Sequence, residues 1–229
     1  MATSNRADLA KVWQIGLCGL THLQCPLDDV VLFTYRECLV SLLNAQRSKP
    51  SVGGPTFSLK HRLLRAIWYS VWLFFAVWTP APLHKWRIFL LCCFGAKIKK
   101  TAHVYGSARI WYPSNLQMGE FACLGPGVIC YCMAPVILSD RALVSQGAHL
   151  CAGSHDYNDP HFQLIAKPIV LGADVWVCAE AFVGLGVEIA DGVVIGARSV
   201  VTKSIVEPWT VHAGNPCRPV GKRNHVVEP

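Results

Sequence analysis

The stretch from 171 to 205, LGADVWVCAEAFVGLGVEIADGVVIGARSVVTKSI, repeats its pattern every six residues. An aliphatic residue begins each repeat, and these residues are Leu171, Val177, Val183, Ile189, Ile195 and Val201. Four positions after each of them the side chain is Val, Ala or Ser, with Ile205 as the exception. A period of six fits neither the 3.6 residues of a helical turn nor the alternation of an ordinary strand. Repeats of fixed period instead predict a solenoid.

The same pattern reaches back to residue 98. All fifteen large positions are apolar, and the first nine are Ile98, Val104, Ile110, Met118, Leu124, Cys130, Leu138, Val144 and Leu150. Each hexad is expected to form a short strand and a turn, with the aliphatic side chain inside and the small one where the chain bends. Three hexads close one coil. We therefore predict an all-β solenoid, a parallel β-helix of about five three-hexad coils over residues 98–206.

Three interruptions break the period. Two extra residues lie between 110 and 118 and again between 130 and 138, where we expect small bulges at corners. The third interruption is larger, because residues 156–170 fall outside the repeat and are predicted to form an extruded loop. Long loops on a rigid scaffold are often functional. Residues 207–229 follow the last repeat as a C-terminal tail.

Residues 59–97, rich in tryptophan and basic residues, are predicted to be helical. The most apolar run, residues 66–78, reaches only about 20 Å as a helix, short of the roughly 30 Å hydrocarbon core. We expect this segment either to pack on the main domain or to lie in a membrane interface. Residues 1–58 are predicted to be an N-terminal extension, disordered or partly helical, with one candidate helix at residues 27–43.

The composition indicates a folded chain with a polyanionic partner. Of the 229 residues, 52% are hydrophobic, which argues against intrinsic disorder. The 21 Lys and Arg exceed the 14 Asp and Glu, so the net charge of +7 favours a nucleotide cofactor, a nucleic acid or an anionic membrane surface. The 11 cysteines form no C-x-x-C pair and no convincing secretory leader is present, so we expect free thiols in the cytoplasm.

His155 is the main catalytic candidate, because it is the last residue before the extruded loop, in the run GSHDYNDP at 153–160. An imidazole can take up a proton near neutral pH, which suits a general base. Either Asp156 or a backbone carbonyl is expected to fix its tautomer. His149, His155 and His161 are spaced six apart, but His161 falls in the loop and nothing secures convergence, so no metal site is predicted.

Four basic residues, Arg198, Lys203, Lys222 and Arg223, lie in the last hexads and the tail. They form either a solvated face or a seat for the phosphates of a nucleotide cofactor. The sequence contains no G-x-x-x-x-G-K-S/T loop and no G-x-S-x-G elbow, so covalent serine chemistry is not predicted.

Several motifs together resemble the hexapeptide acyltransferases, and among them the colanic acid biosynthesis acetyltransferases. Besides the hexads these are GSHDY at 153–157, KPI at 167–169, DVW at 174–176, IGARSVVTK at 195–203 and AGNP at 213–216. The likeness covers about residues 60–223. It implies a left-handed coil, an exception to the usual right-handed crossover. It also implies a homotrimer with active sites between subunits, and acetyl-CoA as the acyl donor.

The resemblance implies roles for individual residues too. His155 matches the family's catalytic histidine. The positions that line the CoA groove in similar enzymes correspond to Trp176, Ala179, Ala197, Thr202 and Lys203, with Lys203 at the CoA phosphates. Galactoside and maltose acetyltransferases place polar acceptor ligands about two coils before the histidine, whereas residues 124–134 here read LGPGVICYCMA. That departure favours a larger or lipid-linked glycan as the acceptor.

These observations predict an O-acetyltransferase that moves an acetyl group from acetyl-CoA to a hydroxyl of a saccharide or glycan precursor, with His155 as general base and without a metal. We expect a homotrimer, peripheral contact with the inner face of a membrane, and no nucleic-acid partner. Two alternatives stay open: a metal-dependent hydratase like the β-helical carbonic anhydrases, and a non-catalytic trimeric scaffold.

Overall fold

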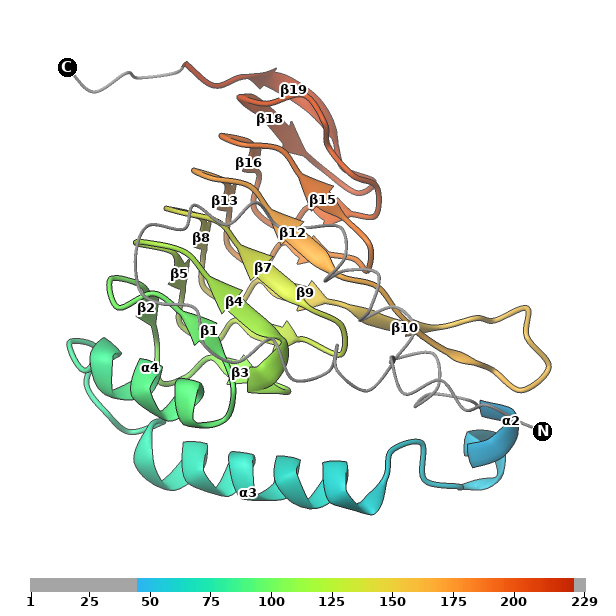
Figure 1. The fold of residues 1–229 in the computed structure, drawn as a ribbon. Helices are drawn as coiled ribbons and strands as arrows, with labels where there is room; N and C mark the ends of the chain where they lie inside the picture. The colour runs from blue at the N-terminus through green and yellow to red at the C-terminus, as the bar shows by residue number, and fades with distance from the viewer. Residues whose placement is uncertain (1–44, 225–229) are drawn as a thin grey trace, which may run out of the picture. The chain divides into compact units, whose positions relative to one another are not determined.

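The computed structural model describes residues 45–224, so the candidate helix at residues 27–43 lies outside the described residues. Short strands follow one another around the coil and stack into three sheets (Figure 1). The predicted left-handed parallel β-helix is confirmed. Five coils are complete, and a sixth begins where Ile205 forms a bridge with Ile189.

Each coil contributes one strand to each sheet. Sheet A consists of β1 (Lys97–Ile98), β4 (Leu116–Met118), β7 (Val136–Leu138), β12 (Ile169–Leu171) and β15 (Glu188–Ile189). Sheet B consists of β2 (His103–Val104), β5 (Cys123–Leu124), β8 (Leu143–Val144), β13 (Trp176–Val177), β16 (Val194–Ile195), β18 (Thr210–Ala213) and β19 (Arg218–Lys222). Sheet C consists of β3 (Arg109–Ile110), β6 (Ile129–Tyr131), β9 (His149–Cys151), β14 (Phe182–Val183) and β17 (Val200–Val201).

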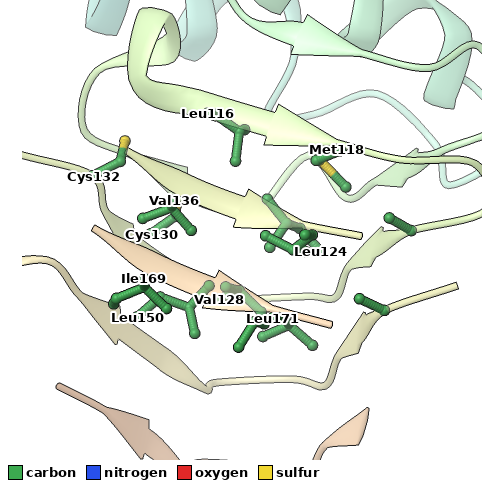
Figure 2. Packing of buried hydrophobic residues seen from close by; sticks show 14 of the residues in the cluster. Leu116, Met118, Leu124, Val128, Cys130, Cys132, Val136, Leu150, Ile169 and Leu171 are labelled. Atoms are coloured by element: carbon green, nitrogen blue, oxygen red, sulfur yellow. The ribbon is translucent and has the colours of Figure 1, made fainter. Parts of the chain in front are cut away.

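Aliphatic side chains stack inside the coil, one coil upon the next. In sheet A, Leu116 pairs with Val136, and Val136 pairs with Ile169. Figure 2 shows these three side chains pointing into the interior, where all are fully buried. Each such side chain contributes about 1.5–3 kcal/mol of hydrophobic stabilisation. The solenoid is therefore held together by continuous apolar ladders.

The two extra pairs of residues in the repeat widen the corner between sheets C and A. In the first coil this corner holds the short helix η2 (Pro113–Asn115). β4 then begins at Leu116, which adds an inward-facing side chain before Met118, the aliphatic position of the repeat. In the second coil Val136 takes the same place. The small bulges expected there are thus a wider corner followed by a three-residue strand, because each added pair supplies one more inward side chain.

The tail after the last hexad closes the C-terminal end of the solenoid. β18 runs parallel to β16, and β19 folds back antiparallel on β18. Arg223 donates hydrogen bonds to the carbonyls of Asp174 (2.7 Å) and Gly192 (3.2 Å). Its guanidinium also lies 5.4 Å from the ring centroid of Trp209. The described part of the tail is therefore an ordered extension of sheet B.

Helices close the other end. After α2 (Ala45–Ser48) and η1 (Pro50–Val52), α3 (Leu59–Phe75) runs beneath the first coil and α4 (His84–Cys93) follows it (Figure 1). The indole N–H groups of Trp68 and Trp72 donate to the carbonyls of Ile110 (2.8 Å) and Ala108 (3.0 Å). Both tryptophans are buried, so this face of α3 packs on the main domain.

Arg87 of α4 is fully buried against the first coil. Its Nε donates to the carbonyl of Val104 (2.6 Å), and its Nη1 and Nη2 donate to Thr79 Oγ1 (2.8 Å), Pro80 O (3.0 Å) and Ala81 O (2.5 Å). Buried carbonyls that lack a donor are costly, and the first coil has no coil below it to pair with. Arg87 thus satisfies carbonyl groups at the junction between the first coil and the helices.

Candidate active site

The extruded segment is a β-hairpin that leaves the third coil at the corner between sheets C and A (Figure 1). β10 (Gly153–His155) pairs antiparallel with β11 (Leu164–Ala166), with His155 opposite Leu164. The hairpin therefore begins three residues before the predicted loop, and the end of that loop already belongs to β12. Backbone groups that leave the coil need new partners, and the two arms supply them to each other.

Two aspartates fix the tip of the hairpin. The Oδ1 of Asp156 accepts from the backbone N–H of Asn158 (2.9 Å), and the Oδ1 of Asp159 accepts from the N–H of His161 (2.7 Å). Such bonds are typical of aspartate in turns. The carboxylate of Asp156, one of the two groups expected to orient His155, is engaged in the turn.

A backbone carbonyl orients His155 instead. Nδ1 of His155 lies 2.9 Å from the carbonyl oxygen of Phe162, and the two rings stack with centroids 4.3 Å apart and planes at 11°. Because a carbonyl can only accept, Nδ1 carries the proton and donates it to this bond. Nε2 is then the unprotonated nitrogen of the neutral ring, which is the atom that a general base needs.

His155 shares one face of the hairpin with a patch of aromatic side chains. A Cβ at Gly153 would lie 2.4 Å from the sulfur of Met133 and 3.2 Å from the Tyr131 ring, so that face looks toward the second coil. Gly153 and His155 point to the same side of the strand because they are two residues apart. Leu164, opposite His155, packs with Met133, beside Phe57, Trp111 and Tyr131. We call Phe57, Trp111 and Tyr131 the aromatic patch.

Two side chains of α3, Arg65 and His61, lie against the aromatic patch. The guanidinium of Arg65 is 4.4 Å from the Trp111 ring centroid and 5.4 Å from that of Phe57. Burial, and next the charge of Arg65, lower the pKa of His61, which favours the neutral form of its ring. Among the described residues, Nδ1 of His61 and Nε of Arg65 are buried without a hydrogen-bond partner. The sequence pattern had not singled out this group.

The predicted cofactor residues lie at two separate edges of the solenoid. Trp176 stands on the outer face of sheet B, where its Nε1 donates to Ser145 Oγ (2.9 Å), and Ala179 and Ala197 lie at the next corner, between sheets B and C. Thr202 and Lys203 are exposed at the corner between sheets C and A, two coils beyond the hairpin. Within a single chain, His155 therefore lies at the same edge of the solenoid as Lys203. Sheet C separates this edge from Ala179.

The basic residues of the last hexads do not form a single cluster. Arg198 donates to Glu180 Oε2 (2.6 Å), Lys222 lies 3.9 Å from Glu207, and Arg223 is bound to the backbone as described above. Lys203 is exposed and has no ion pair within residues 45–224. Of the four, Lys203 is thus the residue whose charge is available to a bound anion.

The three histidines spaced six apart in the sequence lie on different parts of the fold, His149 in β9, His155 in β10 and His161 between β10 and β11. Over the described part of the chain, no group of three or more His, Cys, Asp and Glu side chains is arranged to hold a metal ion. His149 lies on sheet C with its ring edge-on to Phe182, and His161 is in the hairpin turn.

The left-handed parallel β-helix is the fold of the hexapeptide-repeat acetyltransferases. A relative from Escherichia coli (strain K12), "Putative colanic acid biosynthesis acetyltransferase WcaF", is 40% identical over 157 residues, which are 69% of this chain and 86% of the relative. The chain belongs to this family of acetyltransferases. No family model matches the chain.

Two further comparisons agree. The galactoside O-acetyltransferase of Escherichia coli (strain K12) is 29% identical over 132 residues, 56% of this chain and 64% of that protein. The crystal structure of a maltose O-acetyltransferase from Clostridium difficile 630 superposes with a TM-score of 0.64 and 26% identity, covering 73% of this chain and 90% of the other.

Proposed function

We propose that the protein transfers an acetyl group from acetyl-CoA to a hydroxyl of a saccharide or glycan precursor, with His155 as the general base. The observation that carries this proposal is the bond from Nδ1 of His155 to the carbonyl of Phe162, which leaves Nε2 as the proton acceptor. Family membership supports acetyl transfer, and a solved structure of galactoside acetyltransferase is a complex with coenzyme A.

The reaction needs no covalent enzyme intermediate. The acceptor oxygen attacks the thioester carbonyl carbon of acetyl-CoA while Nε2 of His155 takes the hydroxyl proton. The tetrahedral intermediate then collapses, the C–S bond breaks, and the imidazolium returns its proton to the departing thiolate sulfur. The products are the acetyl ester and CoA, and His155 is neutral again. Backbone N–H groups of the coil are expected to stabilise the oxyanion, as donors do in other acyl transfers.

The donor is proposed to lie along Trp176, Ala179, Ala197 and Thr202, with its phosphates at Lys203. We expect Lys203→Ala to raise the Kd for acetyl-CoA about 10- to 100-fold, because a hydrogen bond to a charged group contributes about 1.5–3 kcal/mol. Calorimetry measures this, and the variant should also depend less on salt. Lys100→Ala, at the other end of the solenoid, should bind like the wild type. An unchanged Kd in Lys203→Ala would remove Lys203 from the site.

A homotrimer would unite the two edges of the donor site. In a cyclic trimer, the edge between sheets C and A of one protomer can face the corner between sheets B and C of the next. His155 and Lys203 would then come from one protomer and Trp176, Ala179 and Ala197 from its neighbour. The separation of these residues within one chain supports this arrangement.

The acceptor is proposed to bind against the aromatic patch. Tyr131 and Trp111 present partly exposed rings 5.4 Å apart, on the side toward which His155 points. Sugar rings have apolar faces that can pack on aromatic side chains, and the nearby cation of Arg65 suits acidic or phosphorylated glycans. Polar side chains are sparse there, which supports a large saccharide or a lipid-linked glycan as acceptor.

We expect Tyr131→Ala to raise the KM for the acceptor about two- to tenfold, since one aromatic contact contributes about 0.5–1.5 kcal/mol beyond its buried area. The Kd for acetyl-CoA should stay constant. Phe121→Ala, which removes an exposed ring on another edge, serves as the matched control. Steady-state kinetics with the two substrates varied separately would show the change. Equal KM values for both variants would place the acceptor elsewhere.

The proposed location is the inner face of a membrane, in a reducing compartment. All eight cysteines among residues 45–224 are free thiols, which is the usual state in the cytoplasm. Within the same residues no helix has the length and hydropathy needed to cross a bilayer. The contact with the membrane is accordingly proposed to be peripheral.

The first test is acetyl-CoA binding by calorimetry, with the oligomer mass determined on the same sample. Micromolar binding by a trimer is the expected result. An intact trimer that does not bind acetyl-CoA would favour a scaffold, and stoichiometric zinc in the purified protein would favour a hydratase.

A further inference from the structure

The outer face of the helical end is apolar although nothing in the described structure covers it. Of the 21 large apolar side chains that are exposed in the described residues, 13 lie between Leu59 and Phe89. On α3, Leu63, Leu73 and Phe74 are 56%, 58% and 65% exposed. A helix that is apolar on all sides is normally buried or in contact with lipid. One face of α3 packs on the first coil, so the opposite face is the one without a partner.

The apolar face continues from α3 onto α4. Trp86 of α4 donates its indole N–H to the carbonyl of Phe75 on α3 (2.7 Å), and its ring stacks on Phe89 with centroids 5.8 Å apart. Between the helices, Trp78 is 71% exposed while its N–H donates to Phe74 O (2.6 Å). These indoles have their polar group satisfied and present the ring outward, as tryptophans do at membrane surfaces.

The charge around this face has one sign. The sequence contains no Asp or Glu between Glu37 and Glu120, although all of α3, α4 and the first coil lie in that interval. Exposed basic side chains surround the apolar residues, and they include Lys60, Arg62 and Lys85. A basic rim with apolar side chains at its centre matches the headgroups and upper acyl chains of an anionic bilayer.

We infer that the outer faces of α3 and α4 form a docking surface for an anionic lipid bilayer, with Leu63, Leu73 and Phe74 inserted and Lys60 and Arg62 at the headgroups. The absence of a spanning helix in the described residues agrees with insertion to a shallow depth. The surface itself is independent of the reaction. What the docking surface implies for the acceptor rests on the proposed function.

Docking by this end sets the height of His155 above the membrane. The hairpin leaves the third coil, two coil spacings above the first, and α3 lies between the first coil and the bilayer. Two spacings of about 4.8 Å plus a helix of about 10 Å place the imidazole roughly 20 Å from the surface. The acceptor hydroxyl is therefore expected on a lipid-linked glycan of several sugars and not on the sugar next to the lipid.

The test is cosedimentation of the full chain with vesicles of phosphatidylglycerol and phosphatidylcholine, and with phosphatidylcholine alone. We expect binding to the anionic vesicles, weaker at high salt. The variant L63Q/L73Q/F74Q should lose more than tenfold in vesicle affinity, and K60Q/R62Q about 30-fold, at about 1 kcal/mol for each basic residue. The control F121Q/V206Q/V220Q removes three exposed apolar side chains elsewhere and should bind like the wild type.

Three results would overturn the inference. The first is wild-type protein that stays in the supernatant when the anionic vesicles are pelleted, and the second is binding of L63Q/L73Q/F74Q as tight as that of the control. A lower oligomer mass for L63Q/L73Q/F74Q by light scattering would instead assign the face to contact between copies of the chain. Acetyl transfer to a water-soluble saccharide, measured on the same variants, is expected to be unchanged and so reports on the proposed function separately.

Discussion

Replacing His155 with alanine is expected to lower kcat about 10²- to 10⁴-fold, the usual contribution of a general base. The residual rate would come from binding the two substrates side by side and from oxyanion stabilisation. The Kd for acetyl-CoA should be unchanged, because the imidazole acts on the acceptor hydroxyl. A thiol-release assay for CoA together with calorimetry would measure both quantities.

His161→Ala is the matched control, since it removes an exposed imidazole from the same hairpin. It should retain wild-type turnover. If His155→Ala keeps near-normal turnover, or if both variants lose the same amount, the assignment of the base is wrong.

Replacing Arg87 with alanine is expected to lower the free energy of unfolding by about 3–5 kcal/mol, the largest effect on stability that we predict. The substitution leaves the carbonyl of Val104 and the oxygens of Thr79, Pro80 and Ala81 without the donors described above, and it opens a cavity between α4 and the first coil. Chemical denaturation followed by circular dichroism would give the difference.

Two variants sharpen this test. Lys85→Ala changes an exposed basic residue of the same helix and should stay within about 0.5 kcal/mol of the wild type. Arg87→Met keeps an apolar stem of similar length but no donors. If Arg87→Met is as stable as the wild type, packing and not hydrogen bonding explains the role of Arg87.

The fold was predictable because aliphatic and small side chains recur at fixed positions of a six-residue repeat. Positions such as Val104 and Leu150 alternate with small residues every six places, and only a solenoid buries all of them. The helical end was predictable only in outline. The periodicity of α3 does not distinguish the buried Trp68 from the exposed Leu73 and Phe74, because apolar residues occupy both faces of the C-terminal half of this helix.

The candidate site was predictable where it depends on the repeat and on the family motif. His155 stands where the hexads stop, but the group that orients it is a backbone carbonyl seven residues away, which leaves no signature in the sequence. The aromatic patch does have a sequence signature. Trp111 directly follows the core residue Ile110, Tyr131 directly follows Cys130, and the two aromatic residues are 20 positions apart. That spacing stacks them on the outside of neighbouring coils.

The hydrogen bond between His155 and the carbonyl of Phe162 also bears on how the hairpin can vary. A main-chain acceptor is supplied by any amino acid, so the imidazole keeps its tautomer as long as the two arms of the hairpin keep their register. Tyr157 and the neighbouring tip residues can then change without cost to proton transfer. Divergent members of such a family could acquire new acceptors by drift at the hairpin tip while the chemical step stays the same.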